Sequence, residues 1–186
     1  MLKKELRLNH LKFRKELSSE VIPNYSLRIA NNLLQLPVWK FDYYHLFLSI
    51  TEKNEIDTSF IISILQGKDK NIVVPKVLDN RKLIHYLLTD NTTFRKNKWH
   101  IPEPEDGLEV PPNKIDVVFI PLLAFDELGY RVGYGKGYYD MFINECREDV
   151  LKIGLSLFKP VSKISDVQKH DLRMDYCITP EKVFTF

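Results

Sequence analysis

The fold of this chain is decided by the run Asp116-Val117-Val118-Phe119-Ile120-Pro121 and by the loop Gly133-Tyr134-Gly135-Lys136-Gly137-Tyr138-Tyr139-Asp140 that follows it. The first run is almost wholly apolar, as expected of a strand that is buried on both faces of a parallel sheet. The loop leads into residues 138–147, which we expect to form a helix with Met141 and Phe142 facing inward. A strand, a glycine loop and a helix in this order are typical of phosphate binding, because backbone N–H groups and the helix dipole both favour an anion.

The rest of the chain alternates helices with strands around this unit. An apolar stripe of Leu2, Leu6, Phe13 and Leu17 predicts a helix over residues 2–17. The other expected elements are helices over 22–36 and from Asp57-Thr58 to Gly67, strands over 43–50, 71–77, 82–88, 152–157 and 176–179, and long loops over 90–114. The alternation predicts one α/β layered domain, residues 1–186, with a mostly parallel sheet.

Composition bounds the class of protein. With 186 residues, 44% of them hydrophobic and 28% charged, the chain has the usage of an ordinary globular domain. Its longest apolar run, residues 117–125, is shorter than the ~18 residues of a membrane span, and charged residues interrupt the place of a secretory signal. We therefore expect a cytoplasmic protein with no membrane contact. Cys146 and Cys177 form no C-x-x-C pair, so we interpret them as buried thiols.

The charge is small but uneven. A net charge of +2 argues against nucleic acid as a partner, since such domains usually carry a strongly basic patch or a pI above ~9. Residues 1–16 nevertheless hold six bases and only two acids. We expect an anion to bind near this end of the chain.

The glycine loop fits neither of the common nucleotide motifs. A Walker A loop requires glycine at position 130 and Ser or Thr at 137, whereas the chain has Tyr130 and Gly137. A dinucleotide fingerprint would require glycine at Tyr138. Lys136 can still reach a β- or γ-phosphate as a mobile charge. The residues alone leave open an ATP-using enzyme of another kind, a turn without a ligand, or a non-catalytic module that stacks nucleotides or nucleic acid on Tyr130, Tyr134, Tyr138 and Tyr139.

Two carboxylates are candidate metal ligands. Asp140 lies in the first turn of the expected helix, where the helix dipole stabilises a carboxylate with or without a metal. Asp171 follows His170 in a polar segment. Beside a triphosphate, one or two carboxylates are enough to hold Mg²⁺. Sequence spacing alone does not bring the two together.

Taken with motifs elsewhere, the chain resembles the 5-formyltetrahydrofolate cyclo-ligase family. The resemblance covers most of the chain, and its most specific part is the glycine block with the ending Tyr138-Tyr139-Asp140. The remaining motifs are Lys3-x-x-x-Arg7, Glu55-Ile56-Asp57-Thr58, Trp99-x-Ile101-Pro102-Glu103-Pro104, Pro121-x-x-Ala124-Phe125-Asp126, Gly129-x-Arg131 and His170-Asp171.

This resemblance implies a three-layer α/β/α Rossmann-like fold and a particular reaction. The family closes the ring of 5-formyltetrahydrofolate to 5,10-methenyltetrahydrofolate and converts ATP to ADP and phosphate with Mg²⁺. The resemblance implies that the formyl oxygen attacks the γ-phosphate, that N10 of the folate attacks the activated formyl carbon, and that phosphate leaves. We expect a monomer whose partners are a reduced folate and ATP.

The resemblance also assigns roles to residues. It implies that Lys136, Arg131 and Tyr138 are catalytic and that Asp140 and Asp171 hold the metal. The implied ATP contacts are Lys3, Lys4, Glu5, Leu6, Arg7, Arg131, Val132, Gly133, Tyr134, Gly135, Lys136, Gly137, Tyr138 and Tyr139. The implied folate contacts are Leu48, Glu55 and Trp99, together with Tyr134, Gly135, Lys136, Gly137 and Tyr138.

The chain departs from the family pattern at three places. Leu122 stands where the family has glycine after Pro121, Met141 stands where it often has arginine, and Lys53-Asn54 look like extra residues before Glu55. The first departure puts the local turn in question. None of them removes a group to which the resemblance gives a chemical role.

Overall fold

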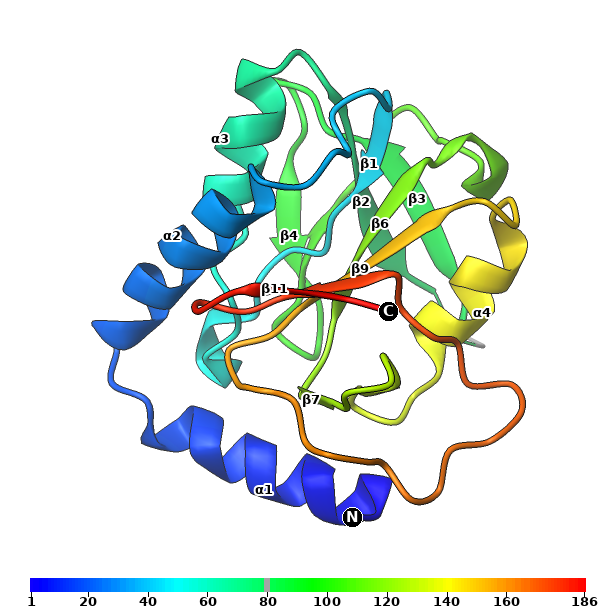
Figure 1. Ribbon diagram of the computed structural model, residues 1–186. Coiled ribbons are helices and arrows are strands. Elements are labelled where there is room, and N and C mark those ends of the chain that lie inside the picture. Colours follow the sequence, from blue (N-terminus) through cyan, green and yellow to red (C-terminus); the bar gives the residue numbers. More distant parts are fainter. Residues whose placement is uncertain (79–80) are drawn as a thin grey trace.

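The computed structural model describes residues 1–78 and 81–186 as one mostly parallel sheet with helices on both of its faces (Figure 1). The helices are α1 (Lys3–Glu16), α2 (Val21–Leu33), α3 (Ser59–Gly67) and α4 (Tyr138–Glu145), with short 3-10 turns at Thr51–Lys53 and Pro112–Lys114. The strands are β1 (Tyr43–His45), β2 (Asn71–Val77), β3 (Leu83–Leu87), β4 (Phe94–Lys96), β5 (Pro102–Pro104), β6 (Val117–Pro121), β7 (Ala124–Phe125), β8 (Arg131–Val132), β9 (Leu151–Leu155), β10 (Tyr176–Ile178) and β11 (Val183–Thr185). Within the described residues, no helix has the length and apolar composition of a membrane span.

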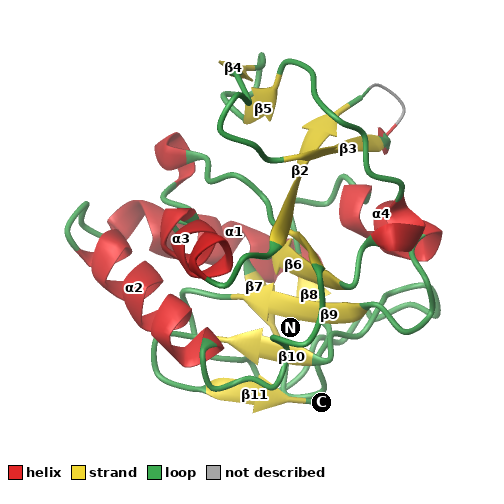
Figure 2. Ribbon diagram, turned by 90° about the horizontal axis from the view of Figure 1, so that it is seen from above, coloured by secondary structure: helices red, strands yellow, loops and turns green. Residues whose placement is uncertain are grey.

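The main sheet has seven strands in the order β11-β10-β9-β6-β1-β2-β3. Its five central strands run parallel, and the edge strands β11 and β3 pair antiparallel with their neighbours. β6 lies in the middle and is buried on both faces. Val117 and Phe119 pack into the cluster under α2 and α3, while Val118 and Ile120 pack into the cluster under α4. Figure 2 shows these helices on opposite sides of the sheet, so the predicted three-layer α/β fold is confirmed.

Several predicted elements end earlier or contain more structure than expected. The strand expected over 43–50 pairs only over Tyr43–His45, because the following residues leave the sheet and line a cavity. The expected loop 90–114 contains the small antiparallel pair β4–β5. The expected helix over 138–147 ends at Glu145. The β7–β8 hairpin and the edge strand β11, which we did not predict, are each only two or three residues long.

Two details of the predicted helix faces are wrong. Met141 is 39% exposed, and Phe142 with Ile143 forms the inner face of α4. In α1 the predicted apolar stripe is only partly buried, since Phe13 is 45% exposed. The buried positions of α1 are instead Leu6, His10 and Arg14, so this helix turns a partly polar face towards the protein.

The predicted end of α3 at Gly67 is confirmed. Gly67 is the last helical residue, and the left-handed conformation that ends such helices is adopted two residues later by Asp69, at φ 55°. The predicted Asp57-Thr58 start is confirmed, because the Asp57 carboxylate accepts the backbone N–H of Ser59 at 3.0 Å.

Candidate active site

A cavity of about 440 Å³ opens where the parallel strands β1, β2 and β6 end. Such carboxyl edges are the usual ligand sites of open α/β sheets, because the loops that follow the strands can diverge there. Parts of the chain that are distant in sequence meet around it, among them α1, the segments that follow β1 and β4, and the glycine loop before α4. The residues that line it are Lys3, Arg7, Phe47, Leu48, Ile50, Lys53, Glu55, Pro75, Val77, Leu83, Trp99, Ile101, Pro102, Pro121, Arg131, Val132, Gly133, Tyr134, Gly135, Lys136, Gly137, Tyr138, Tyr139, Asp140, Asp171 and Leu172.

The glycine loop owes its shape to two left-handed glycines. Gly135 has φ 86° and Gly137 has φ 76°, and Gly137 is the N-cap of α4. Residues with a side chain rarely adopt this conformation, so glycine lets the loop turn directly into the helix. The first residues of α4 line the cavity, and the start of a helix carries unpaired N–H groups and the positive end of its dipole. This arrangement favours an anionic group of the ligand.

Helix α1 supplies cations to the same loop. The Nε of Arg7 donates to the carbonyl of Gly133 at 2.9 Å, and Lys3 pairs with Asp171 on the far side of the loop. Lys3 and Arg7 are four residues apart and therefore lie on one face of the helix. The basic N-terminal segment thus contributes two of its six bases to the cavity wall.

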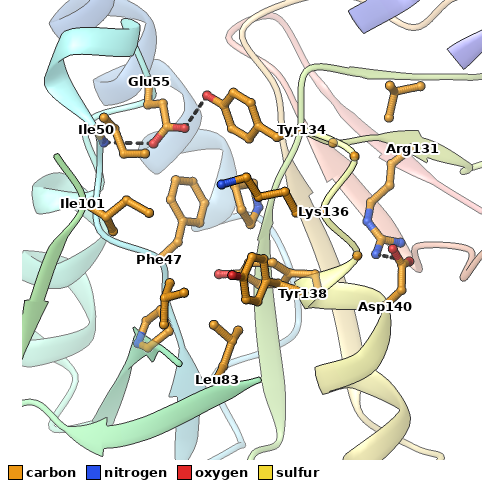
Figure 3. Close-up of a pocket in the computed structure, with 18 of the residues that line it drawn as sticks. Phe47, Ile50, Glu55, Leu83, Ile101, Arg131, Tyr134, Lys136, Tyr138 and Asp140 are labelled. Carbon is orange, nitrogen blue, oxygen red and sulfur yellow. Dashed lines mark hydrogen bonds and ion pairs between the residues drawn. The ribbon is translucent and has the colours of Figure 1, made fainter. Parts of the chain in front are cut away.

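Glu55 is held at the other end of the cavity by hydrogen bonds to both of its oxygens. Oε2 accepts the backbone N–H of Ile50 at 2.8 Å, and Oε1 accepts the hydroxyl of Tyr134 at 2.6 Å (Figure 3). Glu55 is only 6% exposed. Burial and the Glu55 charge raise the pKa of Tyr134, so its hydroxyl stays a proton donor to Glu55.

Lys136 and Tyr138 lie between the two ends of the cavity (Figure 3). The ammonium of Lys136 is 4.3 Å from the ring centroid of Trp99, and the ammonium of Lys98 is 4.5 Å from it. A cation over an indole face is attracted by the ring quadrupole. Trp99 comes from the β4–β5 connection, so this contact joins that connection to the glycine loop.

The two candidate metal ligands are paired with cations. Arg131 Nη2 donates to Asp140 Oδ1 at 2.7 Å, and the Lys3 ammonium contacts Asp171 Oδ2. Burial acts to raise the pKa of Asp171, but the N–H of Gln168 and the charge of Lys3 outweigh it and lower that pKa. No group of three or more His, Cys, Asp or Glu side chains in residues 1–78 and 81–186 is arranged to hold a metal ion.

Most of the predicted site residues line this one cavity, which brings together positions from residue 3 to residue 171. Three predicted ATP contacts do not. Lys4 and Glu5 are exposed and do not line the cavity, and Leu6 is fully buried against Ala124 and Val132. A role for these three residues in ATP binding stays a prediction.

The cavity also contains residues that we did not predict. Lys53 places its ammonium 4.7 Å from the centroid of the Tyr134 ring, although the sequence marked it only as a departure from the family. Apolar walls come from Phe47, Ile50, Val77, Leu83 and Ile101. They lie in β2 and β3, shortly after β1, or two residues after Trp99, but nothing in their spacing separates a cavity wall from an ordinary core.

The fold and the cavity together define an α/β enzyme whose site has a glycine loop with cations at one end and a buried carboxylate at the other. A sequence model described as the 5-formyltetrahydrofolate cyclo-ligase family matches residues 1–180. The chain belongs to that family.

Individual relatives agree with this family assignment. The chain is 28% identical over 183 residues to a probable 5-formyltetrahydrofolate cyclo-ligase of Schizosaccharomyces pombe, with 90% of each chain covered. Among solved structures, the 5,10-methenyltetrahydrofolate synthetase of Aquifex aeolicus matches with a TM-score of 0.84 at 30% identity, covering 100% of this chain and 93% of that one. A 5,10-methenyltetrahydrofolate synthetase of Mycoplasma pneumoniae matches with a TM-score of 0.77 at 26% identity, covering 97% and 99%.

Proposed function

We propose that this enzyme converts 5-formyltetrahydrofolate to 5,10-methenyltetrahydrofolate and uses ATP to remove the formyl oxygen. The observation that carries the proposal is the single cavity, which has a buried carboxylate and apolar walls at one end and a glycine loop with cations at the other. Glu55 suits the N–H donors on the edge of a pterin ring, because an ionised carboxylate only accepts hydrogen bonds. The loop suits the phosphates of ATP.

The chemistry requires the formyl oxygen to become a leaving group. In the proposed reaction this oxygen attacks the γ-phosphorus and ADP leaves, which gives an imidate-like phosphate. N10 of the same folate then attacks the formyl carbon and loses its proton, and the C–O bond breaks to release phosphate. The second step is intramolecular, so the protein contributes mainly by orienting the folate and by stabilising charge on the transferred phosphoryl group.

The cavity residues have matching roles in this proposal. Lys136 and Arg131 counter the phosphate charge, and Tyr138 with Trp99 and Leu48 encloses the pteridine. Lys3 and Arg7 bind phosphate from α1. Since Lys136 lies between the Glu55 end and the Arg131 end of the cavity in Figure 3, its flexible stem can follow the phosphoryl group towards the formyl oxygen.

Magnesium fits the donor set of this site. Asp140 and Asp171 both line the cavity, and carboxylate oxygens with phosphate oxygens are the ligands that Mg²⁺ prefers. We propose that these two residues hold the ion together with ATP. When bound, Mg²⁺ neutralises part of the triphosphate charge. Each carboxylate must then share or exchange its present cationic partner.

A direct assay tests the proposal. Protein, Mg²⁺, ATP and 5-formyltetrahydrofolate are mixed, and the near-ultraviolet absorbance of the methenyl product is followed. We expect the band only when ATP and folate are both present. No band in the complete mixture would contradict the proposal, and phosphate transfer to another small molecule would favour a different ATP-dependent phosphotransferase. That alternative gives no role to the buried Glu55.

The proposed active unit is one chain in the cytoplasm. Light scattering of the purified protein at assay concentration checks this, and a dimer as the sole active species would contradict it.

A further inference from the structure

Helix α1 buries an arginine next to two residues that line the cavity. Arg14 is only 4% exposed and is one of the three buried residues of its helix. A long charged side chain is rarely buried unless it is paired, because removal from water costs free energy that partners must offset. The partners of Arg14 therefore indicate why it is there.

Those partners belong to the active site. Arg14 Nη1 donates to the hydroxyl oxygen of Tyr134 at 3.0 Å and lies 3.8 Å from Oε1 of Glu55. The Tyr134 hydroxyl donates to the same Glu55 oxygen at 2.6 Å. Arg14 Nη2 donates to the carbonyl of Leu122 at 2.5 Å, just after β6. One guanidinium thus contacts the glycine loop, the buried carboxylate and the end of a central strand.

Arg14 contacts Glu55 and Tyr134 without lining the cavity itself. Glu55 and Tyr134 line the cavity, whereas Arg14 does not, so a bound folate would touch the first two and not the arginine. In Glu55, Oε2 accepts one hydrogen bond from the backbone N–H of Ile50, and Oε1 accepts one from the hydroxyl of Tyr134. A carboxylate has about four such acceptor positions. The remaining ones are available to a ligand, provided that the carboxylate keeps its charge and its orientation.

The segment before Glu55 is tied to the same turn of α1. Asn54 adopts a left-handed conformation with φ 48°, and its Nδ2 donates to the backbone carbonyl of Arg14 at 2.7 Å. This bond adds a second donor to a carbonyl at the end of α1, which also accepts the N–H of the C-cap residue Leu17 at 3.3 Å. Asn54, one of the extra residues noted in the sequence, therefore fixes Glu55 relative to Arg14 through the backbone.

We propose that Arg14 is a positioning residue for the folate end of the site. It supplies the countercharge to Glu55 and, through Tyr134, sets the orientation in which that carboxylate accepts the pterin N–H groups. Because Lys3 and Arg7 lie on the same helix, α1 joins the phosphate end of the cavity to the folate end. The inference rests on the proposed function, since it assigns Glu55 to folate.

Binding measurements separate this role from a merely structural one. The variant Arg14→Met removes the charge but keeps a side chain of similar length. Arg14→Lys keeps the charge but loses the planar guanidinium with its several N–H donors. Lys15→Met is the control, from the exposed side of the same helix. The dissociation constant of 5-formyltetrahydrofolate is measured without nucleotide, and that of ADP without folate. We expect Arg14→Met to weaken folate binding about tenfold or more, as for loss of a hydrogen bond to a charged group. The folate dissociation constant of Arg14→Lys should lie between those of the wild type and Arg14→Met. The dissociation constant of ADP should change less than about twofold in both variants.

A second comparison tests whether Arg14 acts through Glu55. In a Glu55→Gln background, Arg14→Met should weaken folate binding no further, because residues in one network are not additive. Equal losses for folate and ADP, an additive loss in the Glu55→Gln background, or no loss at all would each overturn the inference. If Arg14→Met does not fold, folate binding and ADP binding are compared for Arg14→Lys and Tyr134→Phe instead, each with and without Glu55→Gln. A wild-type protein that binds no 5-formyltetrahydrofolate would instead contradict the proposed function.

Discussion

The guanidinium of Arg7 packs directly against the α-carbon of Gly135. A β-carbon built on Gly135 would lie 3.1 Å from the guanidinium carbon of Arg7, and the same arginine donates to the carbonyl of Gly133. Glycine at this position therefore serves two purposes, the left-handed turn and the close approach of α1. The phosphate end of the cavity depends on both.

Alanine substitutions at the three glycines of the loop should lower the unfolding free energy by graded amounts. Gly133 has neither a left-handed φ nor a close neighbour, Gly137 has only the left-handed φ of 76°, and Gly135 has both constraints. We expect Gly137→Ala to cost about 1–2 kcal/mol of unfolding free energy, the usual penalty of a left-handed side chain. Gly135→Ala should cost more, and Gly133→Ala should cost almost nothing.

Chemical denaturation of the three ligand-free variants checks this order. ATP binding should weaken most in Gly135→Ala, because Arg7 must move. Equal stability of Gly137→Ala and Gly135→Ala would show that the contact with Arg7 is not restrictive.

Replacement of Asp140 distinguishes a metal ligand from a carboxylate that only interacts with the helix dipole. If Asp140 holds Mg²⁺, Asp140→Asn should raise the Mg²⁺ concentration for half-maximal activity by roughly tenfold, which corresponds to about 1.4 kcal/mol. Asp149→Asn is a matched control, since Asp149 pairs with Arg147 as Asp140 pairs with Arg131. An unchanged Mg²⁺ requirement, with only a lower melting temperature, would assign Asp140 to its helix and to Arg131.

Removal of the Lys136 ammonium should affect turnover far more than stability. Lys136 is exposed and its observed contact is with the Trp99 ring, so Lys136→Ala should change the unfolding free energy by no more than about 0.5 kcal/mol. Its kcat should fall sharply, because the charge that meets the phosphoryl group is lost. Lys98→Ala, which removes the other cation over Trp99, is the control. Comparable kinetic losses in both variants would indicate that Trp99 packing, and not the phosphate, explains the effect.

The fold could be predicted from the sequence because its strongest signals are local. The apolar β6 and the glycines that follow it specify a buried parallel strand and a helix start. The short strands β7, β8 and β11 could not be predicted, since two or three residues carry no usable periodicity. The face of α1 was misjudged for another reason. Periodicity marks apolar residues as buried, whereas Arg14 is buried through its contacts with Tyr134 and Glu55, which are distant in sequence.

The site was predictable to the extent that its residues are unusual in type. The glycines, Lys136 and Glu55 could be named, and the cavity contains them. The walls around them could not, because Phe47, Val77 and Leu83 are ordinary apolar residues until the sheet places them at its edge.

Two buried histidines should make the protein sensitive to acid. His45 and His85 are fully buried with ring centroids 5.2 Å apart, and none of their ring nitrogens has a hydrogen-bond partner. Burial lowers the pKa of His85 from 6.5 to about 4, and burial together with the charge of His85 lowers the pKa of His45 well below 6.5. A group whose pKa is lowered by folding contributes its full stability above its unfolded pKa of 6.5. That stability is lost as the pH falls towards the folded value.

For His85 alone, the unfolding free energy should fall by about 2 kcal/mol between pH 7.5 and pH 5. Urea denaturation of wild type and His85→Leu at both pH values checks this. The variant should lose correspondingly less on acidification, and His100→Leu at an exposed position should behave as wild type. Identical pH dependence in His85→Leu would show that His85 titrates normally.

Leu122 should be essential to the core, although the family resemblance led us to expect glycine at this position. Leu122 is 1% exposed and is not among the described residues with positive φ, so its backbone has no need of glycine. Its Cδ2 lies 2.7 Å from where a β-carbon of Gly154 would stand, which means that Gly154 on β9 leaves the room that Leu122 fills. Leu122→Gly should therefore lower the unfolding free energy by roughly 4 kcal/mol, the range for emptying a buried leucine site.

The exposed Leu108→Gly removes the same side chain from the surface and should cost about 1 kcal/mol or less, from chain entropy. Thermal and urea denaturation of the two variants isolate the packing contribution. Because Arg14 binds the carbonyl of Leu122, Leu122→Gly should also weaken folate binding. A stabilising Leu122→Gly would instead mean that the turn after Pro121 is strained by its side chain.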